Sequence, residues 1–243
     1  MAILNLNVPE ANLTSPSSWG SRKAVSDQVG SIVSKYGNYI KWASKESNIP
    51  MEVIASFIAV ESGGSPTAGG SGSVTQGLMQ WNRNFAKSTL EGEKKLGRLS
   101  ANEEAKLKTY GITFDKSGLT RSITQADQIK PELNIIIGSI LLGQYIDSIH
   151  DATKFTKDSS GKTIYWGVDK NNTMRLDKII AVYNSGAYGD TGKKARLGNY
   201  ATPLALANDV NSTTSAYIKK MLGVNGGMDV ATKENKDKFD ALR

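Results

Sequence analysis

The chain has 243 residues, a formal net charge of +7 and a sequence pI of about 9.4. It contains no cysteine, which excludes disulfide bonds and thiol chemistry. Its one histidine, His150, rules out a two-histidine zinc motif and allows a Ser-His-Asp triad only with His150 as the base. Carboxylate chemistry therefore remains for an enzyme of this composition. The length allows one large domain, or one domain with appendages.

The positive charge favours polyanionic partners such as nucleic acid, anionic membrane or bacterial cell wall. The basic residues are dispersed, without a run of five or more, so we expect no nucleic-acid partner. No stretch of about 18 apolar residues occurs, and we expect no membrane span. Residues 1–20 lack the basic segment and apolar core of a secretory signal, and an irregular N-terminal tail is expected there.

Residues 22–47 carry apolar side chains at intervals of three and four, which predicts an amphipathic helix. Gly37 lies inside this segment, and we expect the helix to break near it. Asn48-Ile49-Pro50 is typical of a turn, and Pro50 suits the start of a further helix.

A second, apolar helix is expected from Met51 to Glu61. A loop rich in Gly, Ser, Thr and Pro follows, and a compact apolar turn, Gly77-Leu78-Met79-Gln80, ends it. Burial disfavours the charged form of a carboxyl group and raises its pKa, which is what a general acid needs. The pattern makes Glu61 a candidate acid. The alternative is a solvated glutamate at a helix end, beside an ordinary glycine loop.

Helices are next expected over 88–96, 100–110 and 132–150, with a capping box at Ser100 and Glu103 and a loop over 111–130. Residues 151–174 are expected to be a polar insertion, with a short strand at 163–168. The segment 204–222 is expected to form one or two helices, and 224–243 a polar C-terminal tail. A main domain is thus predicted over 21–223.

Three blocks of this sequence resemble the soluble lytic transglycosylases of the goose-type lysozyme-like superfamily. They are Glu61-Ser62 with Gly77-Leu78-Met79-Gln80, then Pro131 to Gly138, then Ile179 to Gly186 with its Tyr-Asn pair, all within about 45–200. The resemblance implies a mainly α, lysozyme-like fold with at most a small β-hairpin, and Glu61 as the acid at the end of a central helix. The substrate-binding residues it implies are Ser62, Ser71, Met79, Gln80, Trp81, Tyr183 and Asn184.

Several of these residues have structural alternatives. Ser62 is equally typical of a turn, Met79 of a core, and Trp81 of either a sugar-stacking ring or a core residue. Tyr183 and Asn184 would otherwise be a core tyrosine and a helix-capping asparagine. Trp81 also replaces the family's usual aliphatic residue, which leaves the detailed loop geometry open. Asn134 in the second block is expected to make a structural hydrogen bond.

Hydrolysis of a glycosidic bond usually needs two carboxylates, and no Asp or Glu lies between Glu61 and Trp81. Their absence favours a peptidoglycan lytic transglycosylase, which forms 1,6-anhydromuramyl ends without consuming water. A muramidase that uses a distant aspartate such as Asp177 or Asp190, or a non-catalytic virion or wall-binding protein of the same fold, are the alternatives. The resemblance implies no metal and no cofactor. We expect a phage-encoded protein that is virion-associated or released at lysis, with tail or other virion proteins as candidate partners.

Overall fold

The computed structural model describes residues 12–150, 175–186, 189–197 and 200–243. These residues are mostly helical with two small antiparallel strand pairs, which confirms the predicted mainly α fold class. The chain divides into two units. One comprises Met1–Asp27 and Tyr145–Lys236, and the other Gln28–Gln144 and Asp237–Arg243. We call them unit 1 and unit 2.

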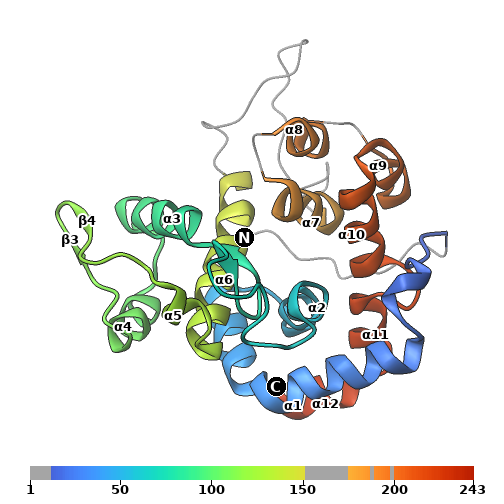
Figure 1. Cartoon of the computed structure of the whole chain (residues 1–243), viewed down its shortest axis with the longest axis horizontal. Helices are drawn as coiled ribbons and strands as arrows, with labels where there is room; N and C mark the ends of the chain where they lie inside the picture. Colours follow the sequence, from blue (N-terminus) through green and yellow to red (C-terminus); the bar gives the residue numbers. More distant parts are fainter. Residues whose placement is uncertain (1–11, 151–174, 187–188, 198–199) are drawn as a thin grey trace. The chain divides into compact units, whose positions relative to one another are not determined.

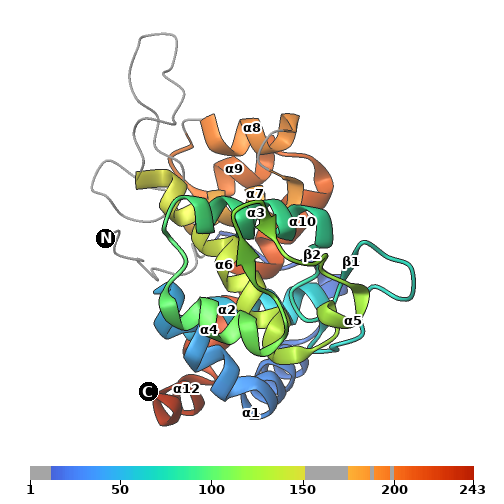
Figure 2. The same ribbon diagram turned by 90° about the vertical axis from the view of Figure 1, so that its left-hand side faces the viewer.

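Unit 2 contains the central apolar helix and the glycine-rich loop (Figures 1 and 2). Its hairpins are β1–β2 and β3–β4, and the second extends beyond α3 and α4 in Figure 1. The helices that lie in it wholly or partly are α1 (Arg22–Ser47), α2 (Met51–Ser62), α3 (Arg83–Lys95), α4 (Ala101–Thr109), α5 (Gln125–Gln128), α6 (Pro131–His150) and α12 (Lys236–Leu242). The strands are β1 (Thr75–Gln76), β2 (Trp81–Asn82), β3 (Phe114–Asp115) and β4 (Gly118–Leu119).

The core of unit 2 forms where the sequence pattern predicts it. Every residue of α2 from Met51 to Ala59 is buried, as are eight successive residues of α6 from Leu133 to Ile140. Helices this apolar on all sides are stable only when other elements surround them. The capping box predicted at Ser100 and Glu103 is confirmed, and it begins α4.

Gly37 does not break α1, contrary to the prediction. The helix continues through this position. The glycine serves helix packing instead, because it leaves space for a residue of α12. A Cβ atom at Gly37 would lie 2.8 Å from a methyl carbon of Leu242. The glycine therefore permits close helix packing within unit 2, and its helix propensity, which is lower than alanine's, is tolerated for that reason.

In unit 1, α7 (Leu176–Ser185) packs against α8 (Asp190–Leu197), α9 (Pro203–Asp209) and α10 (Ser212–Leu222), as Figure 1 shows. The short helix η1 (Ser17–Trp19) and α11 (Gly227–Lys233) also lie in unit 1, as do the first residues of α1 and the last of α6. The segment before η1 is held to the chain after α10 by a parallel bridge between Thr14 and Val224, with Leu13 fully buried.

The segment predicted as a polar C-terminal tail is mainly helical instead. It forms α11 and α12, and the side chains of Met228, Val230 and Phe239 are fully buried. Burial of these apolar side chains explains why the two short helices are ordered. The predicted insertion at 151–174, with its strand at 163–168, lies outside the described residues, as do residues 1–11 of the expected N-terminal tail. Among the residues that are described, no helix is long and apolar enough to cross a membrane.

Candidate active site

Glu61 lies in the last turn of α2 and is half-buried. Gly63 ends the helix in the left-handed conformation, with φ 64°, and donates its backbone N–H to the carbonyl of Ala59 at 3.1 Å. Ser62 donates its hydroxyl to the carbonyl of Ile58 at 3.0 Å and accepts the N–H of Gly64 at 3.2 Å. Its observed hydrogen bonds are thus those of a turn residue that fixes the backbone directly after Glu61.

The two glycines after Ser62 are required by close approach to α1 as well as by their conformation. A Cβ atom at Gly64, where φ is 84°, would lie 2.8 Å from a side-chain carbon of Ile32. Tyr36 of α1 donates its hydroxyl to the Gly64 carbonyl at 3.2 Å. The end of the Glu61 helix is therefore held against α1 by both packing and a hydrogen bond.

The base of the glycine-rich loop is closed at Ala68. Its carbonyl accepts the N–H of Gly77 at 3.0 Å and the side-chain amide of Gln80 at 2.8 Å. Gln80 also donates to the Gly77 carbonyl at 2.8 Å, and its backbone is left-handed, with φ 48°. Because its Nε2 group is used within the loop, Gln80 has its Oε1 atom left to offer to a ligand, as an acceptor.

Asn134 of α6 is the main anchor of this turn, and its predicted structural role is confirmed. Its Oδ1 accepts the N–H of Met79 at 2.8 Å, and its Nδ2 donates to the carbonyls of Gln76 at 3.1 Å and Gln128 at 2.7 Å. The backbone carbonyl of Asn134 accepts the indole N–H of Trp81 at 2.9 Å. One fully buried side chain thus ties together segments more than 50 residues apart in sequence.

Met79 and Trp81 lie in the core of unit 2, with exposed fractions of 0% and 3%. A Cβ atom at Gly138, one turn after Asn134 in α6, would lie 2.4 Å from the sulfur of Met79. The glycine of the second sequence block therefore makes room for the methionine of the first. These contacts favour the packing alternative for both side chains, which support the loop from beneath.

A second anchor, Gln128, was not expected from the sequence. It is fully buried, and its Nε2 donates to the carbonyls of Trp81 at 2.7 Å and Val74 at 3.1 Å. Its Oε1 accepts from Arg83 at 2.8 Å, and Arg83 also donates to the Ser73 carbonyl at 2.9 Å. The sequence did not indicate that Gln128 would be a buried anchor, since it lies in a segment predicted to be a loop.

Asp127, the residue before Gln128, forms a capping box with Thr124 at the start of α5. Burial alone would raise the pKa of Asp127. Hydrogen bonds from Arg121, Thr124 and Lys130 outweigh burial and hold this pKa well below its ordinary value. Asp127 therefore stabilises the α5 turn as a carboxylate at neutral pH.

The other predicted site residues are divided between the two units. Ser71 is exposed at the loop tip. Tyr183 and Asn184 lie in α7 of unit 1, where the rings of Tyr183 and Tyr145 meet edge to face with centroids 6.5 Å apart. Asn184 accepts a hydrogen bond from Thr214 at 3.0 Å. Across the described residues, no group of three or more His, Asp or Glu side chains is placed to hold a metal ion.

Comparison with known families gives one match in this region. Residues 38–104 match the family model of the transglycosylase SLT domain. This match to the SLT domain includes Glu61, the glycine-rich loop and the Gly77–Trp81 turn, and it supports a lysozyme-like domain, peptidoglycan as substrate and lytic transglycosylase activity in general. A search of curated proteins gives no significant match.

Proposed function

We propose that the chain is a lytic transglycosylase that cleaves the MurNAc-(β1,4)-GlcNAc bond of peptidoglycan with Glu61 as general acid and base. The observation that carries the proposal is the position of Glu61. It ends a buried helix inside the segment that matches the SLT domain, and it faces solvent only in part. A half-buried carboxyl group on a rigid helix is suited to proton transfer, because it is both accessible and fixed in direction.

In the proposed reaction, Glu61 donates its proton to the glycosidic oxygen, and the bond from that oxygen to C1 of MurNAc breaks. The acetamido oxygen of the same sugar stabilises the positive charge that develops at C1. Glu61, now a carboxylate, then accepts the proton of the C6 hydroxyl as that oxygen bonds to C1. The products are a 1,6-anhydromuramyl end and a free GlcNAc hydroxyl. Glu61 is again protonated, and no water is consumed.

The charge pattern of the loop supports transglycosylation over hydrolysis. A hydrolase of this kind usually needs a second carboxylate to activate water or stabilise the intermediate. No acidic residue occurs between Glu61 and Trp81. Gln80, whose Oε1 can accept a hydrogen bond, suits the N–H of an acetamido group. Tyr183 and Asn184 are proposed as further substrate contacts on the strength of the sequence resemblance alone.

A phage setting is part of the proposal. The chain would act on the bacterial cell wall during entry or lysis, as a virion component that contacts tail proteins or as a protein released at lysis. Mass spectrometry of purified particles would detect the chain in the first case. Its absence from particles, with accumulation late in infection, would favour the second.

Mass spectrometry of digested peptidoglycan tests the reaction itself. We expect the unmodified chain to release anhydromuropeptides and Glu61→Gln to lose this activity by about 10³-fold or more, because removal of a general acid and base eliminates both proton transfers. Glu91→Gln, on α3, the next helix along the chain, is a matched control and should retain activity. Reducing-end muropeptides would indicate a muramidase, and an active Glu61→Gln variant would contradict the assignment of the acid.

A further inference from the structure

We propose that Thr214 is a positioning residue that fixes the amide of Asn184 so that its N–H groups point to the substrate, where they bind an amide carbonyl oxygen of peptidoglycan. This inference rests on the proposed function. It begins from a hydrogen bond within unit 1, in which the Thr214 hydroxyl donates to Oδ1 of Asn184 at 3.0 Å. Thr214 is only 1% exposed, so this bond is shielded from water.

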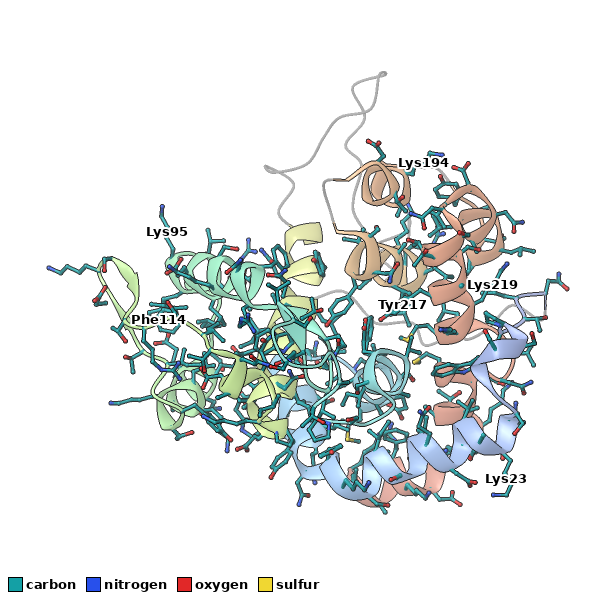
Figure 3. All side chains as sticks on the ribbon, in the orientation of Figure 1. Lys23, Lys95, Phe114, Lys194, Tyr217 and Lys219 are labelled. Atoms are coloured by element: carbon teal, nitrogen blue, oxygen red, sulfur yellow. The ribbon has the colours of Figure 1, made fainter. Side chains whose placement is uncertain are left out.

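The position of Thr214 is itself determined by the first turn of α10. Asn211 caps this helix and accepts the backbone N–H of Thr214 at 2.8 Å. The Nδ2 atom of Asn211 in turn donates to the Thr191 hydroxyl of α8 at 2.8 Å. A series of hydrogen bonds thus runs from α8 through the α10 cap to the end of α7, where Asn184 lies. Tyr217, marked on α10 in Figure 3, follows Thr214 by about one turn and is also buried.

The direction of the Thr214 bond sets the chemistry of Asn184. A threonine hydroxyl has one hydrogen, and a buried hydroxyl that left it unused would be unfavourable. With its Oδ1 accepting that hydrogen, Asn184 keeps the two Nδ2 hydrogens as donors. Asn184 is half-buried, and its Nδ2 donates to no other residue in the described part of the chain. It can therefore bind an acceptor oxygen.

Acceptor oxygens of this kind occur twice in peptidoglycan, in the acetamido groups of the sugars and in the stem peptide. A donor that Thr214 holds in one direction can bind the acetamido carbonyl, which a de-N-acetylated sugar lacks. The assignment thus predicts selectivity for N-acetylated over de-N-acetylated glycan.

Binding measurements on the full chain test the inference independently of catalysis. Each variant is made in a Glu61→Gln background, and its affinity is measured for insoluble peptidoglycan and for a soluble N-acetylglucosamine oligomer. We expect Thr214→Val, which keeps the shape but removes the hydroxyl, to raise Kd about 3- to 10-fold, the effect of one lost hydrogen bond. Thr214→Ser should restore binding to within about 2-fold. Thr213→Val, at the exposed neighbouring position, is the matched control.

Two further variants separate positioning from a general effect on folding. In an Asn184→Ala background, Thr214→Val should have no additional effect on Kd, because Thr214 acts through Asn184. Asn184→Asp keeps the acceptor for Thr214 but removes the donors, so we expect weaker binding. Unchanged or tighter binding by Asn184→Asp, or an equal effect of Thr214→Val with and without Asn184, would overturn the inference.

The probes and the activity assay distinguish the remaining outcomes. A loss of affinity for both probes assigns the acetamido carbonyl, and a loss for peptidoglycan alone assigns the stem peptide. If the chain releases no anhydromuropeptides, the proposed reaction fails, but the binding comparison still decides the role of Thr214. If the chain in the Glu61→Gln background binds neither probe, Asn184 is not a substrate contact and the inference is wrong.

Discussion

At the scale of single residues, Lys178 illustrates the cost of burying a charge. It lies in the first turn of α7 and is 7% exposed. Burial and, to a smaller extent, the neighbouring Arg175 lower the pKa of its amine from 10.5 to about 8, against an opposing effect of Asp177. An amine with a pKa of about 8 is still mostly protonated at neutral pH. The folded state therefore carries the free-energy cost of a buried ammonium group.

The stability of the chain should therefore rise with pH between about 8 and 10.5, the folded and ordinary pKa values of Lys178. In this window the unfolded state binds the proton more tightly than the folded state, so deprotonation favours folding. We expect Lys178→Met to be more stable than the unmodified chain by about 1–3 kcal/mol at pH 7. The gap should narrow towards pH 10. Urea denaturation across this pH range measures both.

A matched control for Lys178→Met is Lys194→Met, at an exposed position of α8 marked in Figure 3. This substitution should leave the dependence of stability on pH unchanged. A Lys178→Met variant that is less stable at pH 7, with the same pH profile as the unmodified chain, would mean that contacts of the Lys178 side chain outweigh the cost of its burial.

Residue types alone predicted some roles correctly and left others undecided. The structural role of Asn134 was predicted, but its partners were not, because Met79 and Gln76 are more than 50 residues away and Gln128 lies in a segment predicted to be a loop. For Trp81 the sequence allowed both a sugar-stacking ring and a core residue. Tertiary packing decides between them, and an indole N–H bonded to the Asn134 carbonyl is a feature that sequence pattern cannot reveal.

At the scale of elements, the glycine-rich loop contains two kinds of left-handed glycine. Gly72 and Gly77 have nearly the same φ, 82° and 87°. A Cβ atom at Gly72 would meet nothing within 4 Å, whereas one at Gly77 would lie 2.2 Å from both Nδ2 of Asn134 and the carbonyl oxygen of Gln128. The first glycine is needed only for its conformation. The second is also needed for space at the anchor of the loop.

Replacement of each glycine by alanine should separate these two requirements. Gly72→Ala should cost about 1–2 kcal/mol, the penalty for a left-handed residue with a Cβ atom. Gly77→Ala should cost several kcal/mol more than that, because it also displaces Asn134 and breaks buried hydrogen bonds. Chemical denaturation of the two variants measures the difference. Equal losses of stability would mean that the Asn134 anchor adjusts freely to the added methyl group.

The C-terminal helices show why short elements escape prediction. Helices α11 and α12 have seven residues each, too few for a helical period to stand out against a polar background. Isolated helices of this length are unstable in water, so they form here only through packing, as at Phe239 and at Leu242 against Gly37. The long helices α1 and α6, by contrast, were predicted close to their observed bounds.

At the scale of the whole molecule, the chain passes between its two units three times, after Asp27, Gln144 and Lys236. All three crossings lie inside helices, α1, α6 and α12. Domain boundaries usually fall in linkers rich in glycine, proline or polar residues, but no such linker lies at these three points. The two units are therefore defined by contacts and not by composition, and the predicted domain over 21–223 stays a prediction.

The segment that matches the SLT domain, residues 38–104, should consequently not fold by itself. It contains Glu61 and the loop, but it lacks the Asn134 and Gln128 anchors of that loop, the Ile32 side chain beneath Gly64, and α12. Without them, the apolar surface of α2 and several backbone groups of the loop would be exposed or unpaired. We expect the isolated fragment to have weak helical circular dichroism and no cooperative thermal transition, while the full chain unfolds cooperatively.

A longer fragment, 28–144, should regain most of the helical signal because it restores both anchors. A cooperative transition in the 38–104 fragment would mean that α2 and its loop form an autonomous core, and that the contacts from α6 adjust the site without being needed to build it.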